Sequence, residues 1–174
     1  MDGDKLIVNL EVLPTTQKAM QRAMSEIRAK ERYTVQLLNA TNDLIYTVDR
    51  EFKLVTWNKP FCRASKLMGV QVKKGMNAFE WWPEKRKEFV EIYKRAFNGE
   101  TFESNSQHAL NGKIYHFLSS LTPLKSEAGE IFEVAVFSKD ITVMTETQIQ
   151  TAELLEVTKQ QAELLRTKEE FLPA

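Results

Sequence analysis

The most reactive side chains in this sequence are one cysteine, Cys62, and two histidines, His108 and His116. A cysteine nucleophile needs a neighbouring base, and no residue next to Cys62 supplies one, so we interpret Cys62 as a small buried apolar residue. The two histidines flank Asn111-Gly112, a dipeptide typical of a tight hairpin turn. Counting outward from that turn places the imidazoles one step apart, on opposite faces of a sheet. We therefore expect neither a shared metal site nor an enzyme.

The composition excludes several other kinds of function. The 174 residues include 24 basic and 24 acidic side chains. This balance argues against a nucleic-acid or anionic membrane surface, because such binding depends on concentrated Lys and Arg. Hydrophobic residues make up 43%, which is enough for a packed core. Because no apolar run approaches the roughly 20 residues that cross a bilayer, we expect a cytoplasmic protein without membrane insertion.

The spacing of apolar residues and turn signals predicts an alternation of helices and strands. Asn58 has the side chain of a helix N-cap, and Pro60 follows in the first turn. Residues 89–97 repeat apolar side chains at helical spacing, and Asn98-Gly99 ends that helix. The expected elements are a short strand or ordered tail at 6–13, helices at 14–40, 58–69 and 83–98, and strands at 44–48, 52–57, 101–110, 113–124 and 131–137. This order predicts an α+β fold with one antiparallel sheet and helices on one side.

Several short motifs occur in an order that is more specific than any one of them. They are Trp57-Asn58-Lys59-Pro60-Phe61 with Leu67 and Gly69, Pro83-Glu84, Ala96-Phe97-Asn98-Gly99-Glu100, Gly129-Glu130-Ile131 and Asp140-Ile141-Thr142. In this order the chain resembles a PAS domain over residues 36–142, although many members have Ala in place of Pro60. The resemblance implies a five-stranded antiparallel sheet with helices on one face, used as a sensory or regulatory module. Residues 1–35 would then form an N-terminal extension with a flanking helix, and residues 143–174 a C-terminal signalling helix.

In a PAS fold the aromatic run Phe79–Pro83 would lie over the sheet, where such domains bind a ligand when they have one. These rings either line a pocket or fill it, and we expect them to fill it. Heme is not expected, because heme-binding relatives take their axial histidine from the long helix, and residues 83–98 contain none. Covalent flavin chemistry is not expected either, because the Asn-Cys-Arg-Phe-Leu-Gln run of light-sensing relatives is absent, so any cofactor stays unknown. If a pocket takes a ligand, the candidate binding residues are Tyr46, Trp57, Trp81, Tyr93 and His116.

Residues 143–172 contain neither Gly nor Pro and would span roughly 45 Å as one helix. Two apolar stripes run along this segment, one through Leu154 and Leu164 and the other through Leu155 and Leu165. Neither stripe is a clean heptad seam, so the segment is either a coiled coil between two copies or a solvated helix. We favour the coiled coil.

The motif Asp140-Ile141-Thr142 joins the expected sheet to this helix, where Asp140 or Thr142 can cap the first turn. We expect these three residues to pass a change in the sheet to the helix. The resemblance thus implies a sensory PAS module that senses a signal or small ligand and relays it to an output domain, a histidine kinase of a two-component system. Its expected partners are a second copy, bound through the flanking helices, and a C-terminal effector domain in the parent protein. The alternative is a ligand-free dimerisation or protein-interaction module.

Overall fold

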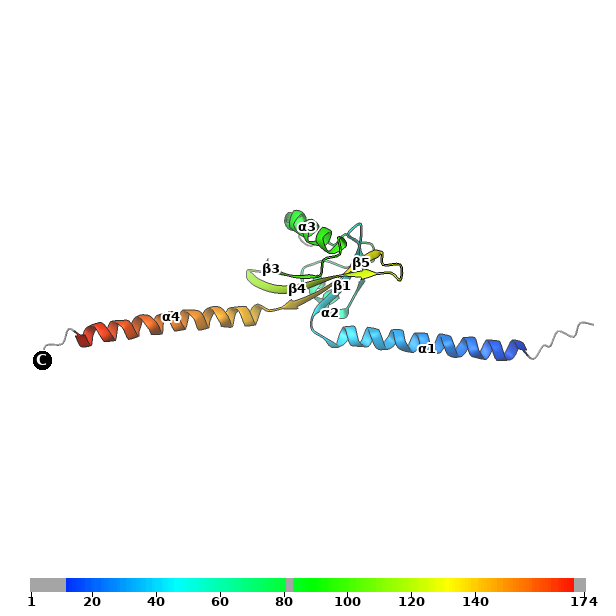
Figure 1. Ribbon diagram of the computed structural model, residues 1–174, viewed down its shortest axis with the longest axis horizontal. Helices are drawn as coiled ribbons and strands as arrows, with labels where there is room; N and C mark the ends of the chain where they lie inside the picture. Colours follow the sequence, from blue (N-terminus) through cyan, green and yellow to red (C-terminus); the bar gives the residue numbers. More distant parts are fainter. Residues whose placement is uncertain (1–11, 81–82, 171–174) are drawn as a thin grey trace, which may run out of the picture. The chain divides into compact units, whose positions relative to one another are not determined.

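The computed structural model describes residues 12–80 and 83–170, with side chains for 16–80 and 83–167. The chain forms two compact units that divide after Thr41. The first unit contains α1 (Val12–Ala40). The elements of the second unit are β1 (Leu44–Asp49), β2 (Leu54–Trp57), α2 (Lys59–Leu67), η1 (Pro83–Lys85), α3 (Arg86–Phe97), β3 (Phe102–Leu110), β4 (Lys113–Lys125), β5 (Ile131–Asp140) and α4 (Thr142–Glu170) (Figure 1).

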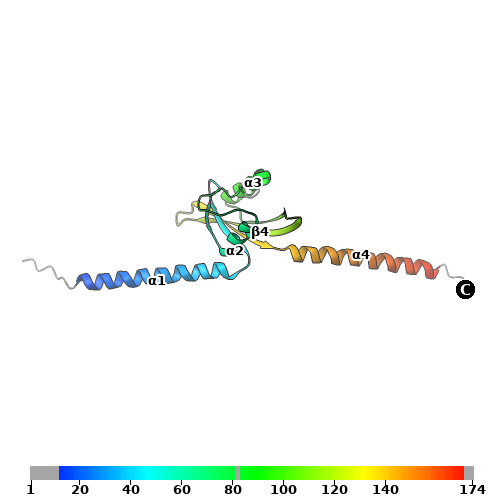
Figure 2. The ribbon, with the colours of Figure 1, turned by 180° about the vertical axis from the view of Figure 1, so that it is seen from behind.

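The five strands form one antiparallel sheet in the order β2-β1-β5-β4-β3. The turn between β3 and β4 is made by Asn111 and Gly112, which have φ angles of 51° and 78°. Two consecutive left-handed residues match the twist of a two-residue hairpin, so this turn fixes the register. His108 consequently pairs with Tyr115, and Gln107 with His116, as the sequence predicts. Figure 2 shows α3 on one side of the sheet and β5 running directly into α4.

Asn58 joins the first strand to the first helix of the sheet unit. Its Oδ1 accepts hydrogen bonds from the backbone N–H groups of Phe61 at 3.0 Å and Ile45 at 3.1 Å. Its Nδ2 donates to the carbonyl oxygen of Asp43 at 2.8 Å. The predicted N-cap of α2 is therefore confirmed, and the same side chain also holds the start of β1.

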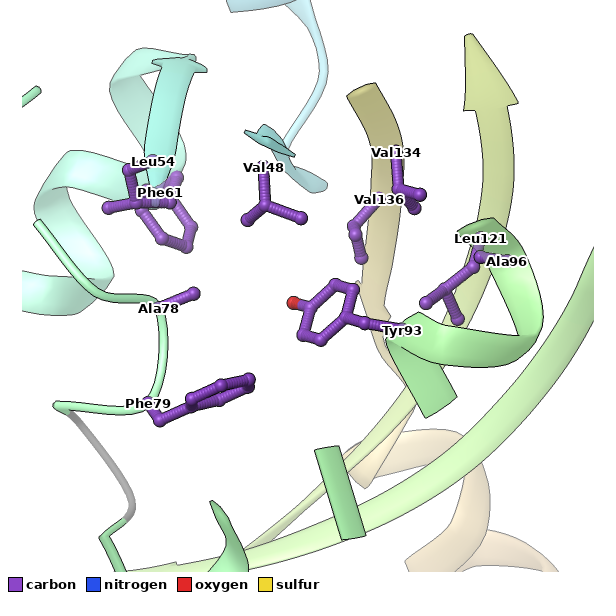
Figure 3. Packing of buried hydrophobic residues seen from close by; sticks show 10 residues of the cluster. All are labelled: Val48, Leu54, Phe61, Ala78, Phe79, Tyr93, Ala96, Leu121, Val134 and Val136. Carbon is purple, nitrogen blue, oxygen red and sulfur yellow. The ribbon is translucent and has the colours of Figure 1, made fainter. Parts of the chain in front are cut away.

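The hydrophobic core lies between the sheet and the helices α2 and α3 (Figure 3). Val48 of β1 and Val134 of β5 are both fully buried on the face of the sheet that we call the inner face. Tyr93 reaches from α3 into the middle of this cluster, and its hydroxyl points away from the helix toward Ala78 (Figure 3). The expected placement of helices on one face of an antiparallel sheet is confirmed for α2 and α3 by their packing on this cluster.

The long helix α1 starts two residues earlier than the sequence predicts. Pro14 lies in its first turn, where a missing N–H leaves no helical hydrogen bond unmade. The predicted strand or tail at 6–13 lies outside the described residues except for Val12 and Leu13, which are helical, so a strand is wrong there. Met20 and Ile27 of this helix are both more than half exposed within the first unit.

The helix α4 begins at Thr142 and leaves its apolar side chains in solvent. Thr142 is 3% exposed, whereas Leu155 is 71% exposed and every side chain from Glu146 to Thr167 is exposed. A helix in water gains most of its stability from packing an apolar face, so α4 has apolar surface available for a partner. None of the helices in residues 12–80 and 83–170 is both long and apolar enough to cross a membrane.

Candidate ligand cavity and its junction with the C-terminal helix

The inner face of the sheet changes from apolar to polar toward the end of β5. Val136, Ser138 and Asp140 share this face because side chains alternate along a strand. Across the sheet, Ser138 pairs with Ser119 of β4, and Asp140 pairs with Phe117. The polar positions therefore lie at the end of β5 that leads into α4.

A cavity of about 290 Å³ lies over this polar part of the inner face. Its floor is the sheet, and Phe61 and Ala64 of α2 with Phe89 and Tyr93 of α3 form the opposite wall. The full lining consists of Asn42, Leu44, Tyr46, Phe61, Ala64, Leu67, Met68, Ala78, Phe89, Tyr93, Ser106, His108, Leu110, Tyr115, Phe117, Ser119, Ser138 and Asp140. Asn42, Leu67 and Asp140 are the exposed members of this set, so they mark the rim of the cavity.

Aromatic rings make up much of the cavity wall. The rings of Tyr46 and Phe61 lie 4.5 Å apart between centroids, at 30° to one another. The His108 ring stacks at 6.2 Å on Phe89 and lies 5.8 Å from Phe117. A planar ligand that lies against these rings gains offset stacking in addition to its apolar burial.

Two hydroxyl pairs provide hydrogen-bonding groups inside the cavity. The hydroxyls of Tyr46 and Tyr93 lie 3.0 Å apart, and the Ser119 hydroxyl donates to that of Ser138 at 2.8 Å. Burial raises the pKa of Tyr46, and burial together with the neighbouring Tyr46 raises the pKa of Tyr93 well above its usual value. Both phenols are therefore neutral at physiological pH.

His108 is a neutral polar group on the β3 side of the cavity. Its Nε2 lies 3.2 Å from the hydroxyl of Ser106, which faces the same cavity. Burial, assisted by the positive charge of Lys85 and opposed by Glu84, lowers the pKa of His108 to about 4. The imidazole is therefore uncharged at pH 7 and can accept or donate a hydrogen bond.

The junction between β5 and α4 is a short chain of hydrogen bonds that starts at the cavity rim. Asp140 Oδ1 accepts from the backbone N–H of Thr142 at 2.9 Å and from its hydroxyl at 2.5 Å. The same hydroxyl accepts from the backbone N–H of His116 at 2.9 Å, and the carbonyl of His116 accepts from Ile141 N–H at 2.8 Å. Asp140 thus caps the first N–H of α4, whereas Thr142 links α4 to β4.

The structure brings together only some of the candidate binding residues. Tyr46 and Tyr93 line the cavity and contact each other through their hydroxyls. Trp57 lies on the edge strand β2, where it pairs with Tyr46 of β1. It packs against the core and does not line the cavity. His116 is wrong as a pocket residue, because it alternates with the inward-facing Tyr115 and Phe117 and so points to the outer face. Trp81 lies outside the described residues.

The cavity residues on β3, β4 and β5 are absent from the predicted binding set. Ser106 and His108 on β3, Ser119 on β4 and Ser138 on β5 all line the cavity. The available signal was the hairpin register, which groups His108 with Tyr115 and separates both from His116. Of the aromatic run expected to fill the pocket, Phe79 is buried in the core cluster, whereas Trp81 and Trp82 lie outside the described residues, so the filling stays a prediction.

Comparison with known proteins identifies the class to which this sheet, cavity and junction belong. A family model described as "PAS fold" matches residues 38–146, which is more than half of the chain. The chain therefore belongs to the PAS fold family, and the resemblance stated from its motifs is confirmed. No curated protein matches the sequence.

Solved structures show the same fold at low sequence identity. The PAS domain of Bordetella pertussis BvgS is 20% identical with a TM-score of 0.54, over 74% of this chain and 98% of that domain. The PAS domain of an HTR-like protein from Haloarcula marismortui is 17% identical with a TM-score of 0.54, over 70% and 99%. An RNA-binding Light-Oxygen-Voltage receptor is 17% identical with a TM-score of 0.54, over 93% of this chain and 42% of the receptor. The chain thus spans less than half of that receptor, and at these identities the likeness concerns the fold alone.

Proposed function

We propose that this chain is a sensory module in which occupancy of the cavity is relayed through Asp140 and Thr142 to α4. The observation that carries the proposal is the double role of Asp140, which lines the cavity and also binds the first turn of α4. A ligand at the rim contacts the same carboxylate that holds the Thr142 hydroxyl. Any ligand that prefers one arrangement of this carboxylate shifts the population of α4 arrangements by its differential affinity. The module itself performs no catalysis.

The output is proposed to pass through a coiled coil between two copies of α4, toward an effector domain such as a histidine kinase. Over its 29 residues α4 spans roughly 43 Å, at about 1.5 Å per residue. Leu154 and Leu164 of one stripe and Leu155 and Leu165 of the other are each more than half exposed. Two adjacent stripes allow two pairing registers of similar energy, which suits a helix that switches between states.

Hydrogen–deuterium exchange of the whole chain with indole, a neutral bicyclic probe, tests the relay. We expect slower exchange around the cavity and a changed exchange rate at residues 142–146. In Thr142→Val the cavity effect should persist while the effect on α4 disappears. Protection of the cavity without any change in α4 would contradict the relay.

A pair of cavity variants shows where the probe binds. Ala64→Leu adds apolar volume to the cavity wall and should abolish protection by indole. Ala109→Leu makes the same change at an exposed position of β3 outside the lining and should leave protection intact. If indole gives no protection in the unmodified chain, the ligand-free dimerisation module becomes the better description.

Sedimentation measurements test the coiled coil independently of any ligand. Leu154→Glu and Leu155→Glu each place a charge in one of the two stripes and should shift the chain toward monomer. Ile149→Glu is the matched control, because this residue is 51% exposed and lies outside both stripes. Equal sedimentation of all three variants and the unmodified chain would argue against pairing through α4.

A further inference from the structure

Among the residues that the structure describes, the cavity lining carries a negative charge and no positive charge. Asp140 carries the only formal charge at neutral pH among the described residues of the lining, which include no Lys or Arg. His108 is neutral there because burial holds its pKa at about 4. An anionic ligand would lose hydration on entering and gain no counter-ion, whereas a cationic ligand would gain the carboxylate of Asp140.

Half of the Asp140 carboxylate is available for such a contact. Both hydrogen bonds that Asp140 accepts, from the N–H and the hydroxyl of Thr142, go to Oδ1. Oδ2 makes no hydrogen bond within the part of the chain that the structure describes. Because Asp140 is exposed at the rim, a charged donor bound to Oδ2 keeps part of its hydration.

Behind the rim the cavity is suited to a flat apolar body. Phe61, Phe89 and Phe117 line it from α2, α3 and β4, together with the ring of His108. Its volume of about 290 Å³ is at the lower end of small-molecule sites, so one or two fused rings fit and a larger cofactor does not. A ligand whose ring lies within these walls can direct a substituent of that ring toward Asp140.

We propose that the cavity binds a small aromatic amine, with its ring among the three phenylalanines and its protonated amino group paired with Asp140 Oδ2. The inference rests on the proposed function, namely that this cavity is the sensory site. It adds the charge and the shape of the ligand. It also adds the route of the signal, because the amine binds the carboxylate that caps α4.

Three probes with the same ring and different charge test the proposal by calorimetry on the whole chain. Tryptamine is cationic, 3-ethylindole is neutral and indole-3-propionate is anionic. A charge-assisted hydrogen bond at an exposed rim predicts that tryptamine binds about tenfold more tightly than 3-ethylindole. Indole-3-propionate should bind more weakly than either.

Two charge-removing variants on β5 locate the counter-ion. Asp140→Asn should lower the tryptamine affinity about tenfold while leaving 3-ethylindole within about twofold, so the neutral probe also reports that the cavity is intact. Glu133→Gln removes the same charge from the opposite face of the strand and should change neither affinity.

The outcomes separate this inference from the proposed function. Equal affinity for the three probes, or a tryptamine preference that survives in Asp140→Asn, would overturn the ligand class while leaving a functional cavity. Binding of indole with a response in α4, but no tighter binding of tryptamine, would have the same meaning. Failure of every probe to bind would overturn the ligand class and the sensory function together.

Discussion

The hydroxyl of Tyr46 on β1 lies 3.0 Å from the hydroxyl of Tyr93 on α3, so one hydrogen bond between two cavity-lining residues joins the sheet to the helix. Two hydroxyls carry two hydrogens, and this bond uses one of them. The pair can therefore still donate one hydrogen bond to a ligand. Because both side chains are held in the aromatic cluster, the position of this donor is fixed before any ligand binds.

Removing one hydroxyl of this pair should cost nearly as much stability as removing both. Tyr93→Phe leaves the Tyr46 hydroxyl buried without its partner, at a cost of about 1–2 kcal/mol in the free energy of unfolding. The double variant Tyr46→Phe with Tyr93→Phe should cost less than the sum of the single variants, because no orphaned hydroxyl remains. Urea denaturation of the four proteins measures this coupling. Tyr115→Phe, also in the cavity wall, is the control and should change stability by less than about 0.5 kcal/mol.

The stability of the domain should depend on pH through His108. The pKa of His108 is lowered to about 4, from a usual value of 6.5, so between these values the unfolded chain binds a proton that the folded chain does not. Stability should therefore fall as the pH drops from about 6.5 to about 4, by at most about 3 kcal/mol. NMR titration of the imidazole gives the pKa directly. His108→Phe keeps an aromatic ring and should lose this part of the pH dependence; an unchanged profile would assign the effect to other groups.

The Thr142 hydroxyl should contribute more to the stability of the domain than the Thr147 hydroxyl, which lies further along α4. Thr142→Val keeps the shape of the side chain but leaves the N–H of His116 without its acceptor, which should cost about 1–3 kcal/mol. Amide exchange at His116 should rise in parallel. Thr147→Val is the matched control, because its hydroxyl bonds only to the carbonyl of Val143 within the exposed helix, and it should cost less than about 0.5 kcal/mol.

Asn58 both accepts hydrogen bonds through Oδ1 and donates one through Nδ2, and we expect the loss of either function to destabilise the domain. Asn58→Asp retains an acceptor for the N–H groups of Phe61 and Ile45 but loses the donor to Asp43 and places a charge at a site that is 3% exposed. We expect a loss of about 2–3 kcal/mol for Asn58→Asp and for Asn58→Ala, by different routes. Thermal denaturation at pH 4 and pH 7 distinguishes them, since the Asp variant should recover part of its stability when protonated. A variant as stable as the unmodified chain would show that α2 does not depend on this cap.

Short sequence motifs correctly predicted the register of one hairpin and the start of one helix. Asn111-Gly112 can adopt two left-handed conformations in succession, and this property alone determined the register of β3 and β4. Asn58 and Pro60 predicted the start of α2 because capping depends on a few neighbouring atoms. Such features are encoded within a few residues and do not depend on distant packing.

The cavity was harder to predict because it is a volume left between distant elements. Both faces of β4 carry large side chains, Tyr115 and Phe117 on one and Ile114 and Leu118 on the other, so alternation alone does not tell which face is inside. The predicted binding set therefore contains His116, which lies on the outer face, and omits His108, which lines the cavity.

The chain enters and leaves the sheet unit at neighbouring points. Leu44, the first residue of β1, pairs directly with Ser138 near the end of β5, so Asn42, just before β1, and Asp140, the last residue of β5, lie at adjacent strand ends. A segment whose two ends adjoin can be duplicated, deleted or exchanged between genes while the flanking helices need only a short splice. The pairing of β1 with β5 therefore allows residues 42–140 to be exchanged between proteins as one unit, with no change needed in the sequences on either side.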